Sequence, residues 1–525
     1  MNARAVPMPA QVAAPVPLVG ARKIIAFAIM CLGMFIALVD IQIVSASLRE
    51  IGGGLSAGSD ETAWVQTAYL IAEIVVIPLS GWLSRVFSTR WLFSASAIGF
   101  TIASLLCGFA WDIHSMIAFR ALQGFLGGSM IPMVFTMAFV FFDNKQRVIA
   151  ASSIGAIASL APTLGPTLGG WITDHWSWQW LFFVNVVPGL IVAIGVYKMV
   201  TIDKPDLSLL RGADYLGIVL LALFLGCLEY TLEEGPRWNW FSDSTITATA
   251  WIAALGGVAF IWRTLTFSQP LMDLRALKDR NFALGSLFSF ITGVGLFATI
   301  YLTPLFLGRV RGYSALQIGE AVFSTGVFQI MTVPIYAWLA RRFDLRWILM
   351  FGLALFALSM WEFAPITHDW GARELLFPQA LRGAAQQLSV APTVVLTLGS
   401  LPPLRLKLAS GLFNTMRNLG GAIGIALCAT ILNDRTNLHF QRLADHLNYT
   451  NEAMDGWIAT TATRLGTMDA QAVLRPLWQV TYREAQTLAY SDAFLVIMCG
   501  FVVATLLVPL MRKVAPPSQP SADGH

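Results

Sequence analysis

The chain has 525 residues, of which 56% are hydrophobic and only 12% are charged, with a formal net charge of +4. A soluble protein uses about twice that share of charged residues to cover its surface, so the composition excludes a soluble enzyme and predicts a membrane protein with many spans. The thinly spread positive charge also argues against a nucleic-acid partner.

Residues 1–20 are rich in Ala, Pro and Val, and we expect a disordered cytoplasmic tail there rather than a signal peptide. A helix needs about 20 apolar residues to cross a membrane. Scanning with that length predicts an all-α protein of fourteen spans. They begin near Ile24, Thr62, Leu92, Ile113, Val148, Trp178, Tyr215, Thr245, Phe282, Leu316, Trp347, Leu375, Leu408 and Asp492.

Lys and Arg residues gather on one side of the predicted spans, in an excess of roughly four to one over the short loops of the other side. This asymmetry places both termini in the cytoplasm. Residues 433–490 then form a long outer loop between the last two spans. Loops of this length are functional or disordered, and the periodic apolar residues here favour an ordered helical projection.

The sequence contains an internal repeat, in which a segment that leaves one span recurs 256 positions later. The matched residues are Pro78, Trp82, Arg85, Phe87 and Arg90 in the first copy and Pro334, Trp338, Arg341, Phe343 and Arg346 in the second. A weaker echo pairs Ala121–Gly124 with Ala380–Gly383. The repeat predicts two duplicated six-helix bundles, an architecture of transporters whose bundles rock about a site near the membrane midplane.

The expected domains follow from this repeat. The first bundle is expected at 21–200 and the second at 281–512, with two extra spans in 201–280 and a cytoplasmic tail at 513–525. Three arginines of the repeat, Arg85, Arg90 and Arg341, could latch helix ends at an inner gate or contact lipid phosphates. The topology rule alone explains them equally well.

Charged residues inside spans are costly, so they face a cavity or a partner. Asp40 and Arg120 lie at matching depth in the first and fourth spans, and we expect them to pair. A carboxylate that faces a guanidinium stays ionised, whereas one that loses this partner in a dry site favours its protonated form. Their separation would turn Asp40 into a proton acceptor. A static structural pair is the alternative.

Glu73 lies in the middle of the second span with no basic residue in that span, so it is a second candidate for carrying a proton or binding a cationic substrate. A neutral Glu that is hydrogen-bonded to a neighbour is equally compatible. Three further acids, Glu229, Glu320 and Glu362, lie near predicted span ends and are expected to be solvated.

Helix-breaking residues concentrate in the fifth span, at Gly165, Pro166, Gly169 and Gly170. Prolines and glycines weaken a helix, and small residues allow close helix approach. We expect a bent helix at the interface between the bundles. In the thirteenth span, Arg417 precedes several glycines, which favours either closure against the opposite bundle, contact with an anionic ligand or plain helix packing.

Motifs for other energy sources and for catalysis are absent from the sequence. It contains no phosphate-binding loop, no clustered metal ligands and no nucleophile elbow. We therefore expect no cofactor, no metal and no enzymatic activity, and an ion gradient as the source of energy. Non-transporting receptors or scaffolds, and membrane-embedded enzymes, are the other classes that the composition allows.

The motifs together resemble the major facilitator superfamily, and most closely its fourteen-span drug:proton antiporters of the EmrB/QacA type. Asp40 lies in a match to the first-span motif, and Arg120, Gln123 and Gly124 match the fourth-span motif. The most specific match is the antiporter motif of the fifth span. Matches of the other spans include Trp64, Tyr69, Pro78, Gly81, Trp178, Trp180, Asn185, Pro188, Asn414, Arg417, Gly420, Gly421 and Gly424.

The resemblance implies export of hydrophobic or amphipathic compounds, including antibiotics, across the bacterial inner membrane in exchange for protons. The 433–490 loop resembles that of members that dock a periplasmic adaptor (a membrane fusion protein) and an outer-membrane channel. A dedicated exporter of a phenolic acid, fatty acid or siderophore is the alternative within transport. The sequence departs from the superfamily at Arg85 and Ser88, near positions that usually carry an acid and a glycine.

Overall fold

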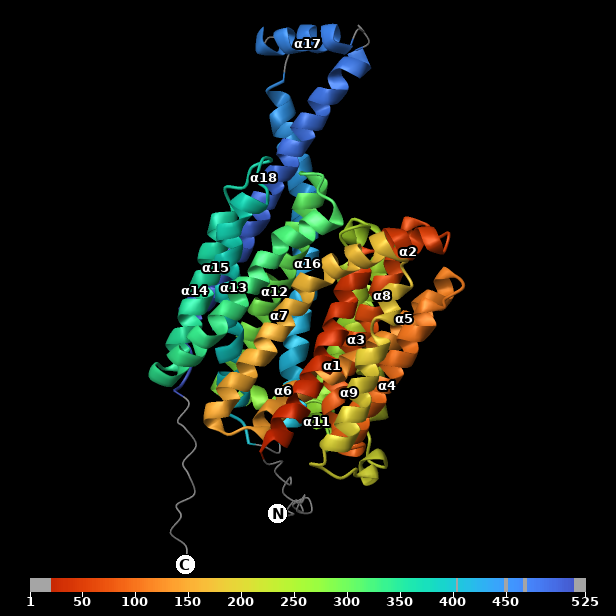
Figure 1. Cartoon of the computed structure of the whole chain (residues 1–525), viewed down its shortest axis with the longest axis vertical. Coiled ribbons are helices and arrows are strands. Elements are labelled where there is room, and N and C mark those ends of the chain that lie inside the picture. Colours follow the sequence, from red (N-terminus) through yellow and green to blue (C-terminus); the bar gives the residue numbers. More distant parts are fainter. Residues whose placement is uncertain (1–19, 403–404, 448–451, 466–469, 514–525) are drawn as a thin grey trace, which may run out of the picture.

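The computed structural model describes residues 20–402, 405–447, 452–465 and 470–513, which form helices joined by turns and loops, without a strand in those ranges (Figure 1). The expected tails at 1–20 and 513–525 therefore fall outside the described residues, except for Gly20 and Lys513. The helix α1 begins and α18 ends at the same end of the molecule (Figure 1).

Six spans precede residue 200 and form the first group of helices. The helices are α1 (Ala21–Ala46), the short α2 (Leu48–Gly54), α3 (Ser59–Val86), α4 (Thr89–Gly108), α5 (Ile113–Gly128), α6 (Met130–Phe141), α7 (Asn144–His175), α8 (Trp180–Phe183) and α9 (Val186–Met199). The helices α5 and α6 form one span that is interrupted at Ser129, after two glycines and before Pro132, because these residues weaken the helical hydrogen-bond ladder. We call this group the N bundle.

Six further spans follow residue 280. They are α12 (Arg280–Arg309), α13 (Ala315–Arg342), α14 (Leu345–Phe363), α15 (Ala372–Leu398), α16 (Leu406–Asp445) and α18 (Ala470–Leu507), and α17 (Glu452–Leu465) lies outside the group. We call this group the C bundle. Short 3₁₀ segments occur at Leu207–Leu210, Trp240–Ser242, Leu274–Lys278 and Val508–Leu510.

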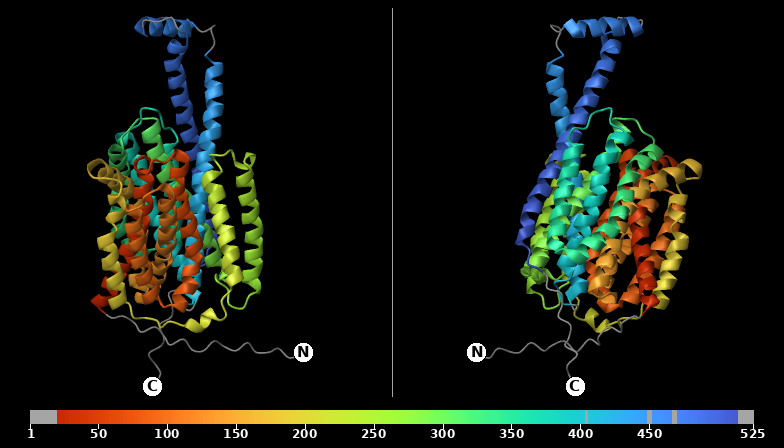
Figure 2. Two further views of the ribbon diagram at one scale, coloured as in Figure 1. Left: turned by 90° about the vertical axis from the view of Figure 1, so that its right-hand side faces the viewer. Right: turned by 60° about the vertical axis from the view of Figure 1, so that its left-hand side comes forward.

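Two helices between the bundles, α10 (Tyr215–Glu234) and α11 (Ser244–Thr266), form the linker pair. The helix α10 packs against α3 of the N bundle and α16 of the C bundle, whereas α11 packs mainly on α10. Large apolar side chains of α11, such as Trp251 and Val258, are exposed. Since the linker pair stands beside α16 at the edge of the molecule (Figure 2, left), these side chains suit contact with lipid.

The predicted count of fourteen spans agrees with the helices. Twelve spans in the described part of the chain are both long and apolar enough to cross a membrane. The helices α7 and α15 have 32 and 27 residues and are therefore also long enough, although they are more polar. The predicted fold class, an all-α membrane protein with two six-helix bundles and two extra helices, is confirmed.

Aspartates are the N-cap residues of α5, α10, α11, α12 and α14. The side chains of Asp112, Asp214, Asp243, Asp279 and Asp344 each accept a hydrogen bond from a backbone N–H in the first turn of the helix that follows. Such caps satisfy donors that a helix leaves unpaired at its start. These bonds stabilise the ionised carboxylate and lower the pKa of Asp112.

In the segment 433–490 the described residues 433–445, 452–465 and 470–490 are helical, as the apolar period predicts. The helix α16 continues to Asp445 and α18 begins at Ala470, so both extend beyond the ends of the other spans as a projecting hairpin (Figure 1). The Phe440 ring of α16 contacts the rings of Trp478 and Tyr482 of α18, with centroid separations of 6.2 and 6.1 Å, and so joins the two arms. The last span is therefore the membrane half of one long helix rather than a helix that starts near Asp492.

The internal repeat appears as a repeated set of helix neighbours. In the N bundle α1 packs on α7, α3 on α5 and α4 on α9, and in the C bundle α12 packs on α16, α13 on α15 and α14 on α18. Each bundle has an apolar core of its own, and the first core also takes in side chains from α15 and α16. The bundles meet where α7 contacts α13 and where α3 contacts α16.

Glycines of α16 set its distance from α12. A Cβ on Gly420 would overlap the carbonyl oxygen of Phe290, and one on Gly424 would lie 2.8 Å from that of Val294. Both partners belong to the same bundle as α16. The glycines after Arg417 therefore serve helix packing within the C bundle.

The close approach of α16 and α12 predicts that Gly420→Ala destabilises the protein by about 1–3 kcal/mol, because a backbone oxygen cannot move aside easily. The matched change Gly456→Ala in α17, where nothing lies within 4 Å of the added carbon, should be neutral or stabilising because Ala favours helix. Thermal unfolding of the two purified variants in detergent, followed by tryptophan fluorescence, measures the difference. Equal melting temperatures would contradict the packing role.

Candidate functional site

The predicted partners Asp40 and Arg120 meet inside the N bundle. An ion pair joins Arg120 Nη1 to Asp40 Oδ2 over 2.5 Å, and both side chains have 0% exposure. The helix α1 carries the carboxylate and α5 carries the guanidinium, which also donates from Nε to the carbonyl oxygen of Val65 on α3. Its Cζ lies 4.2 Å from the centroid of the Tyr69 ring. Three helices therefore fix the pair.

Amide side chains complete the shell around the carboxylate. Gln123 Nε2 and Asn185 Nδ2 donate to Asp40 Oδ1 over 3.1 and 2.6 Å. Both amides also donate to the hydroxyl of Ser104 on α4, and Gln123 Oε1 accepts from Arg120 Nη1 over 2.7 Å. The bonds that Arg120, Gln123 and Asn185 donate to Asp40 favour its ionised form, because they place donors at both oxygens.

The ion pair of Asp40 and Arg120 was predicted from the sequence, but the full set of residues around it was not. Gln123 and Asn185 were singled out only because they match motifs of the family, and Ser104 was not predicted. A buried serine in a span gives no distinct signal in the sequence, because it is also a common packing residue in membrane helices.

Glu73 is placed at the seam between the bundles, with 4% exposure and no hydrogen-bond partner among the described residues. Its carboxyl group is close enough to Arg417 of α16 for the two charges to interact, and it also interacts with Asp40 and Arg120. Arg417 lies over the ring of Phe135 on α6, with 5.2 Å between Cζ and the ring centroid. Arg417 therefore belongs to the C bundle but faces the N bundle.

The C bundle repeats the framework of the site without its ion pair. Gln379 and Arg382 stand where the N bundle has Arg120 and Gln123, and Gln379 Nε2 donates to Ala321 as Arg120 donates to Val65. Arg382 has 1% exposure, and its Nη2 donates to Thr325 and Gln379. No acid forms an ion pair with it in the described part of the chain. Among the described residues, the buried ion pair of a carboxylate with an arginine therefore occurs in the N bundle and not around Arg382.

The glycines of the fifth span hold α7 against α1. A Cβ on Gly165 would overlap the side chain of Gln42, and one on Gly169 would lie 2.7 Å from the Ile43 carbonyl oxygen. These contacts begin two residues beyond Asp40. The same helix packs on α13 of the opposite bundle, so α7 does lie at the interface between the bundles, but Gly165 and Gly169 face α1 rather than the C bundle.

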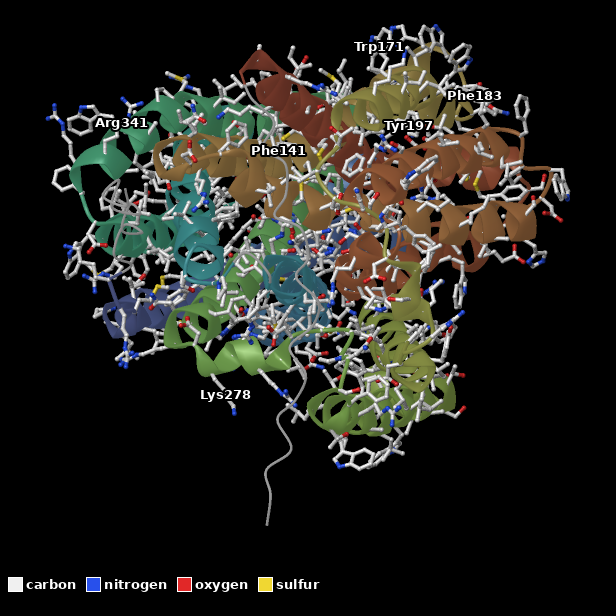
Figure 3. The ribbon with its side chains drawn as sticks, turned by 90° about the horizontal axis from the view of Figure 1, so that it is seen from below. Phe141, Trp171, Phe183, Tyr197, Lys278 and Arg341 are labelled. Carbon is white, nitrogen blue, oxygen red and sulfur yellow. The ribbon has the colours of Figure 1, made fainter. Side chains whose placement is uncertain are left out.

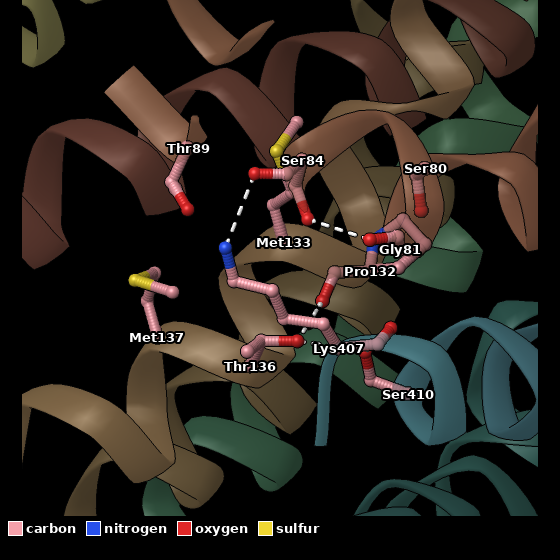
Figure 4. A pocket seen from close by; sticks show the side chains of 10 residues that line it. All are labelled: Ser80, Gly81, Ser84, Thr89, Pro132, Met133, Thr136, Met137, Lys407 and Ser410. Atoms are coloured by element: carbon pink, nitrogen blue, oxygen red, sulfur yellow. Dashed lines mark hydrogen bonds between the residues drawn. The ribbon is translucent and has the colours of Figure 1, made fainter. Parts of the chain in front are cut away.

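The bundles also contact each other at the end where α3 finishes and α16 begins (Figure 4). Lys407 Nζ forms an ion pair with Asp203 over 2.5 Å and donates to the carbonyl oxygen of Ser84 over 3.2 Å. Asp203 also accepts bonds from Thr89 at the start of α4. The recess lined by Gly81, Ser84, Lys407 and their neighbours leaves no space for a water molecule.

The three arginines predicted as an inner gate do not make this contact. Arg85 and Arg341 are exposed, and Arg341 lies at the outer edge of the molecule (Figure 3). Arg90 lies over the Tyr197 ring of its own bundle, with 5.0 Å between Cζ and the centroid. Lys407 and Asp203 make it instead, and no local sequence pattern predicts this contact because the two residues are 204 positions apart.

Within the described ranges, no group of three or more His, Cys, Asp or Glu side chains is arranged to hold a metal ion. The site is a buried ion pair inside one bundle, beside a seam with two further charged groups. An arrangement of this kind can bind and release a proton if the two charged partners separate.

Comparison with known proteins identifies the family to which the chain belongs. Residues 30–425 match the Major Facilitator Superfamily, and the chain belongs to this family of membrane transporters. Solved structures show the same fold: the proton:xylose symporter XylE aligns with a TM-score of 0.59 at 12% identity, covering 93% of this chain and 95% of that one. The human organic anion transporter MFSD10 aligns with a TM-score of 0.56 at 13% identity, covering 91% and 99%.

The sequence relatives are EmrB-type exporters. The colistin resistance protein EmrB of Acinetobacter baumannii is 36% identical over 491 residues, which cover 93% of this chain and 96% of the relative. The multidrug export protein EmrB of Escherichia coli K12 is 30% identical, covering 86% and 91%. The fatty acid resistance protein FarB of Neisseria gonorrhoeae is 28% identical, covering 94% and 96%. The predicted resemblance is confirmed.

The contact between the bundles predicts a cross-link. Hydroxyl oxygens of Thr136 on α6 and Ser410 on α16 lie 2.7 Å apart, so the double variant Thr136→Cys, Ser410→Cys should form a disulfide with a mild oxidant. The background should lack the five native cysteines. The cross-link is expected to stop transport by at least tenfold, with recovery after reduction.

Thr136→Cys combined with Thr430→Cys is the control, because Thr430 lies five turns further along α16 and contacts Trp240. It should neither cross-link nor lose transport. Full transport by the oxidised Thr136→Cys, Ser410→Cys protein would show that this contact does not open during the cycle.

Proposed function

We propose that the protein is a proton-coupled antiporter that exports hydrophobic or amphipathic drugs across the bacterial inner membrane. The observation that carries this proposal is the fully buried Asp40–Arg120 ion pair. Buried charges in membrane helices are costly and mark ion pathways, and this pair lies in the only bundle of the described chain that combines the acid with the arginine.

The pair supplies a switch for a proton. With Arg120, Gln123 and Asn185 in place, Asp40 stays ionised. If α1 moves relative to α5, the carboxylate loses these donors in a dry site and takes up a proton. Since Gly165 and Gly169 hold α7 against α1 next to Asp40 and α7 also packs on the C bundle, a swing of the bundles is transmitted to this carboxylate.

Substrate would bind at the seam between the bundles, beside Glu73 and Arg417. Both side chains lie within the part of the structure where α3, α6 and α16 meet. The Lys407–Asp203 contact closes the end of the seam that the topology rule places in the cytoplasm. Gly170, Pro166 and Gly124 are proposed to support the same movement through close helix packing, and Arg85, Arg90 and Arg341 to contact lipid phosphates at that end.

A dedicated exporter of a carboxylic acid is a second candidate. Two buried arginines, Arg417 and Arg382, have no acid within ion-pair distance among the described residues, and they would suit a carboxylate substrate. The FarB relative carries fatty acid resistance in its name. Uptake of a labelled fatty acid into inverted vesicles, measured beside a cationic drug, separates the two.

The projecting hairpin supports the proposal of a periplasmic adaptor and an outer-membrane channel as partners. Trp478 and Val480 on α18 are 52% and 47% exposed, and both belong to the segment 433–490 that contains the hairpin. Exposed aromatic side chains of this kind are typical of protein interfaces.

Asp40→Asn is expected to lower drug resistance of cells and drug-driven proton movement in proteoliposomes at least tenfold, because the neutral amide cannot bind or release a proton. Protein level and membrane insertion should stay normal. Glu320→Gln on α13 is the matched control, since Glu320 is exposed, and it should leave both readouts unchanged. Full activity of Asp40→Asn would defeat the proposal.

Removal of residues 441–481, with Phe440 joined to Tyr482 by a short Gly/Ser loop, should end co-purification with a periplasmic adaptor. The two rings lie 6.1 Å apart, so a short loop can join them. Proton-coupled flux in vesicles should persist, because the bundles are untouched. Co-purification that survives the deletion would count against the adaptor.

A further inference from the structure

A polar cavity of about 280 Å³ lies at the end of the molecule opposite the Lys407–Asp203 contact. Four parts of the chain line it: the turn between α10 and α11, the end of α12, and α16 and α18 at the base of the projecting hairpin. The linker pair stands beside α16 there (Figure 2, left). Since one water molecule needs roughly 15 Å³, the cavity has room for a larger polar group.

The cavity lies at the level of the lipid headgroups. Counted at about 1.5 Å per residue, Arg309 is about 44 Å along α12 and Asp434 about 42 Å along α16. The topology rule puts the starts of both helices on the cytoplasmic side, and a bilayer with its headgroups is about 40–45 Å thick. On α10 the boundary comes after Glu229, which is buried with 5% exposure. The expectation of a solvated acid at that position is therefore wrong.

Opposite charges line this cavity without neutralising each other. Arg309 and Asp434 are both in the lining, and neither forms an ion pair or a hydrogen bond within the described ranges. The third charged residue of the lining, Arg237, lies 3.7 Å from Glu234. Side-chain amides add further donors and acceptors, from Asn239, Asn433, Asn437 and Gln486. A ligand that carries both a negative and a positive group would satisfy both charges, whereas a simple ion would satisfy one.

The turn between α10 and α11 is held in a strained shape at the edge of the cavity. Asn239 and Trp240 have φ angles of 53° and 56°, a left-handed backbone that a bulky residue rarely adopts. Trp240 Nε1 donates to the Thr430 hydroxyl of α16 over 3.0 Å. Asn433 Nδ2 donates to the carbonyl oxygen of Pro236, also over 3.0 Å. Backbone strain that the surroundings maintain in this way clusters at ligand sites.

Aromatic side chains accompany the polar lining. Tyr482 and Tyr490 of α18 line the cavity, and the Tyr490 ring is 2% exposed and packs edge-on against Phe306, with 5.4 Å between centroids. In the turn itself, Trp238 and Phe241 are 45% and 68% exposed. Aromatic faces attract ammonium groups, and exposed aromatic side chains at headgroup level anchor in the membrane surface. An apolar surface therefore adjoins the polar cavity.

We propose that this cavity binds the headgroup of a zwitterionic phospholipid of the outer leaflet. The phosphate would lie on Arg309, because a guanidinium matches phosphate geometry, and the ammonium group on Asp434. A soluble zwitterion would use the same two charges but not the exposed rings of Trp238 and Phe241. The bound lipid would join the linker turn to the base of the hairpin. Lipid binding at this place does not depend on the proposed proton coupling.

The test titrates delipidated full-length protein with phosphatidylethanolamine in detergent and measures the bound fraction by native mass spectrometry. Arg309→Gln should weaken binding about tenfold, because the phosphate loses a charge-assisted hydrogen bond. Asp434→Asn should weaken it to a similar degree through the ammonium group. Both side chains are exposed, so folding is at little risk.

Phosphatidylglycerol with the same acyl chains separates the two contacts, because its headgroup has the phosphate but no ammonium group. Its affinity should fall in Arg309→Gln and stay at the native value in Asp434→Asn. The matched controls are Arg311→Gln and Asp445→Asn, whose side chains are exposed and lie outside the lining. Both should bind phosphatidylethanolamine as the native protein does.

Native affinity for phosphatidylethanolamine in both Arg309→Gln and Asp434→Asn would overturn the proposal. An equal loss of both lipids in Asp434→Asn would show that this carboxylate does not read the ammonium group, and would overturn a zwitterionic ligand. Free phosphoethanolamine is the third probe. Binding of this solute as tightly as the lipid would make the cavity a solute site and overturn the lipid as its occupant.

Discussion

The structure depends on the cost of keeping a charged pair dry. Asp40 and Arg120 are completely enclosed, and their charges are tolerable only because both carboxylate oxygens accept hydrogen bonds, from Arg120 and Gln123 of α5 and from Asn185 at the start of α9. Several helices of the N bundle must therefore keep their relative positions while the pair is formed. Any movement that opens the bundle also changes the preferred protonation state of the carboxylate.

The fold could be predicted from the sequence almost completely, because apolar length and the 256-residue repeat are properties of the local sequence. Pairing of Asp40 with Arg120 could also be inferred, since depth in a span can be counted from its end. The contact of Lys407 with Asp203, the nearness of Glu73 to Arg417 and the burial of Glu229 could not. They depend on which faces of distant helices meet, and a span that is apolar all round does not reveal its orientation.

The two bundles share a framework but not a chemistry. Gln379, Arg382 and Gly383 reproduce the packing of Arg120, Gln123 and Gly124 on the neighbouring helix, including the close approach of the glycine to a backbone oxygen. The acid of the first bundle has no equivalent around Arg382 in the described residues. The two bundles thus share their helix packing, while the buried acid–arginine ion pair occurs in only one half of the described chain.

The carboxylate that holds Lys407 lies in the chain segment between α9 and α10, and not in the loop between α3 and α4. This segment joins the N bundle to the linker pair. A twelve-helix derivative made by deleting α10 and α11 would change the length of the segment between α9 and α10, or leave it unattached at one end, and this segment positions Asp203. Such a minimal transporter would lose the Lys407–Asp203 ion pair unless the excision started well after residue 206. The backbone N–H of that residue is bonded to the end of α3.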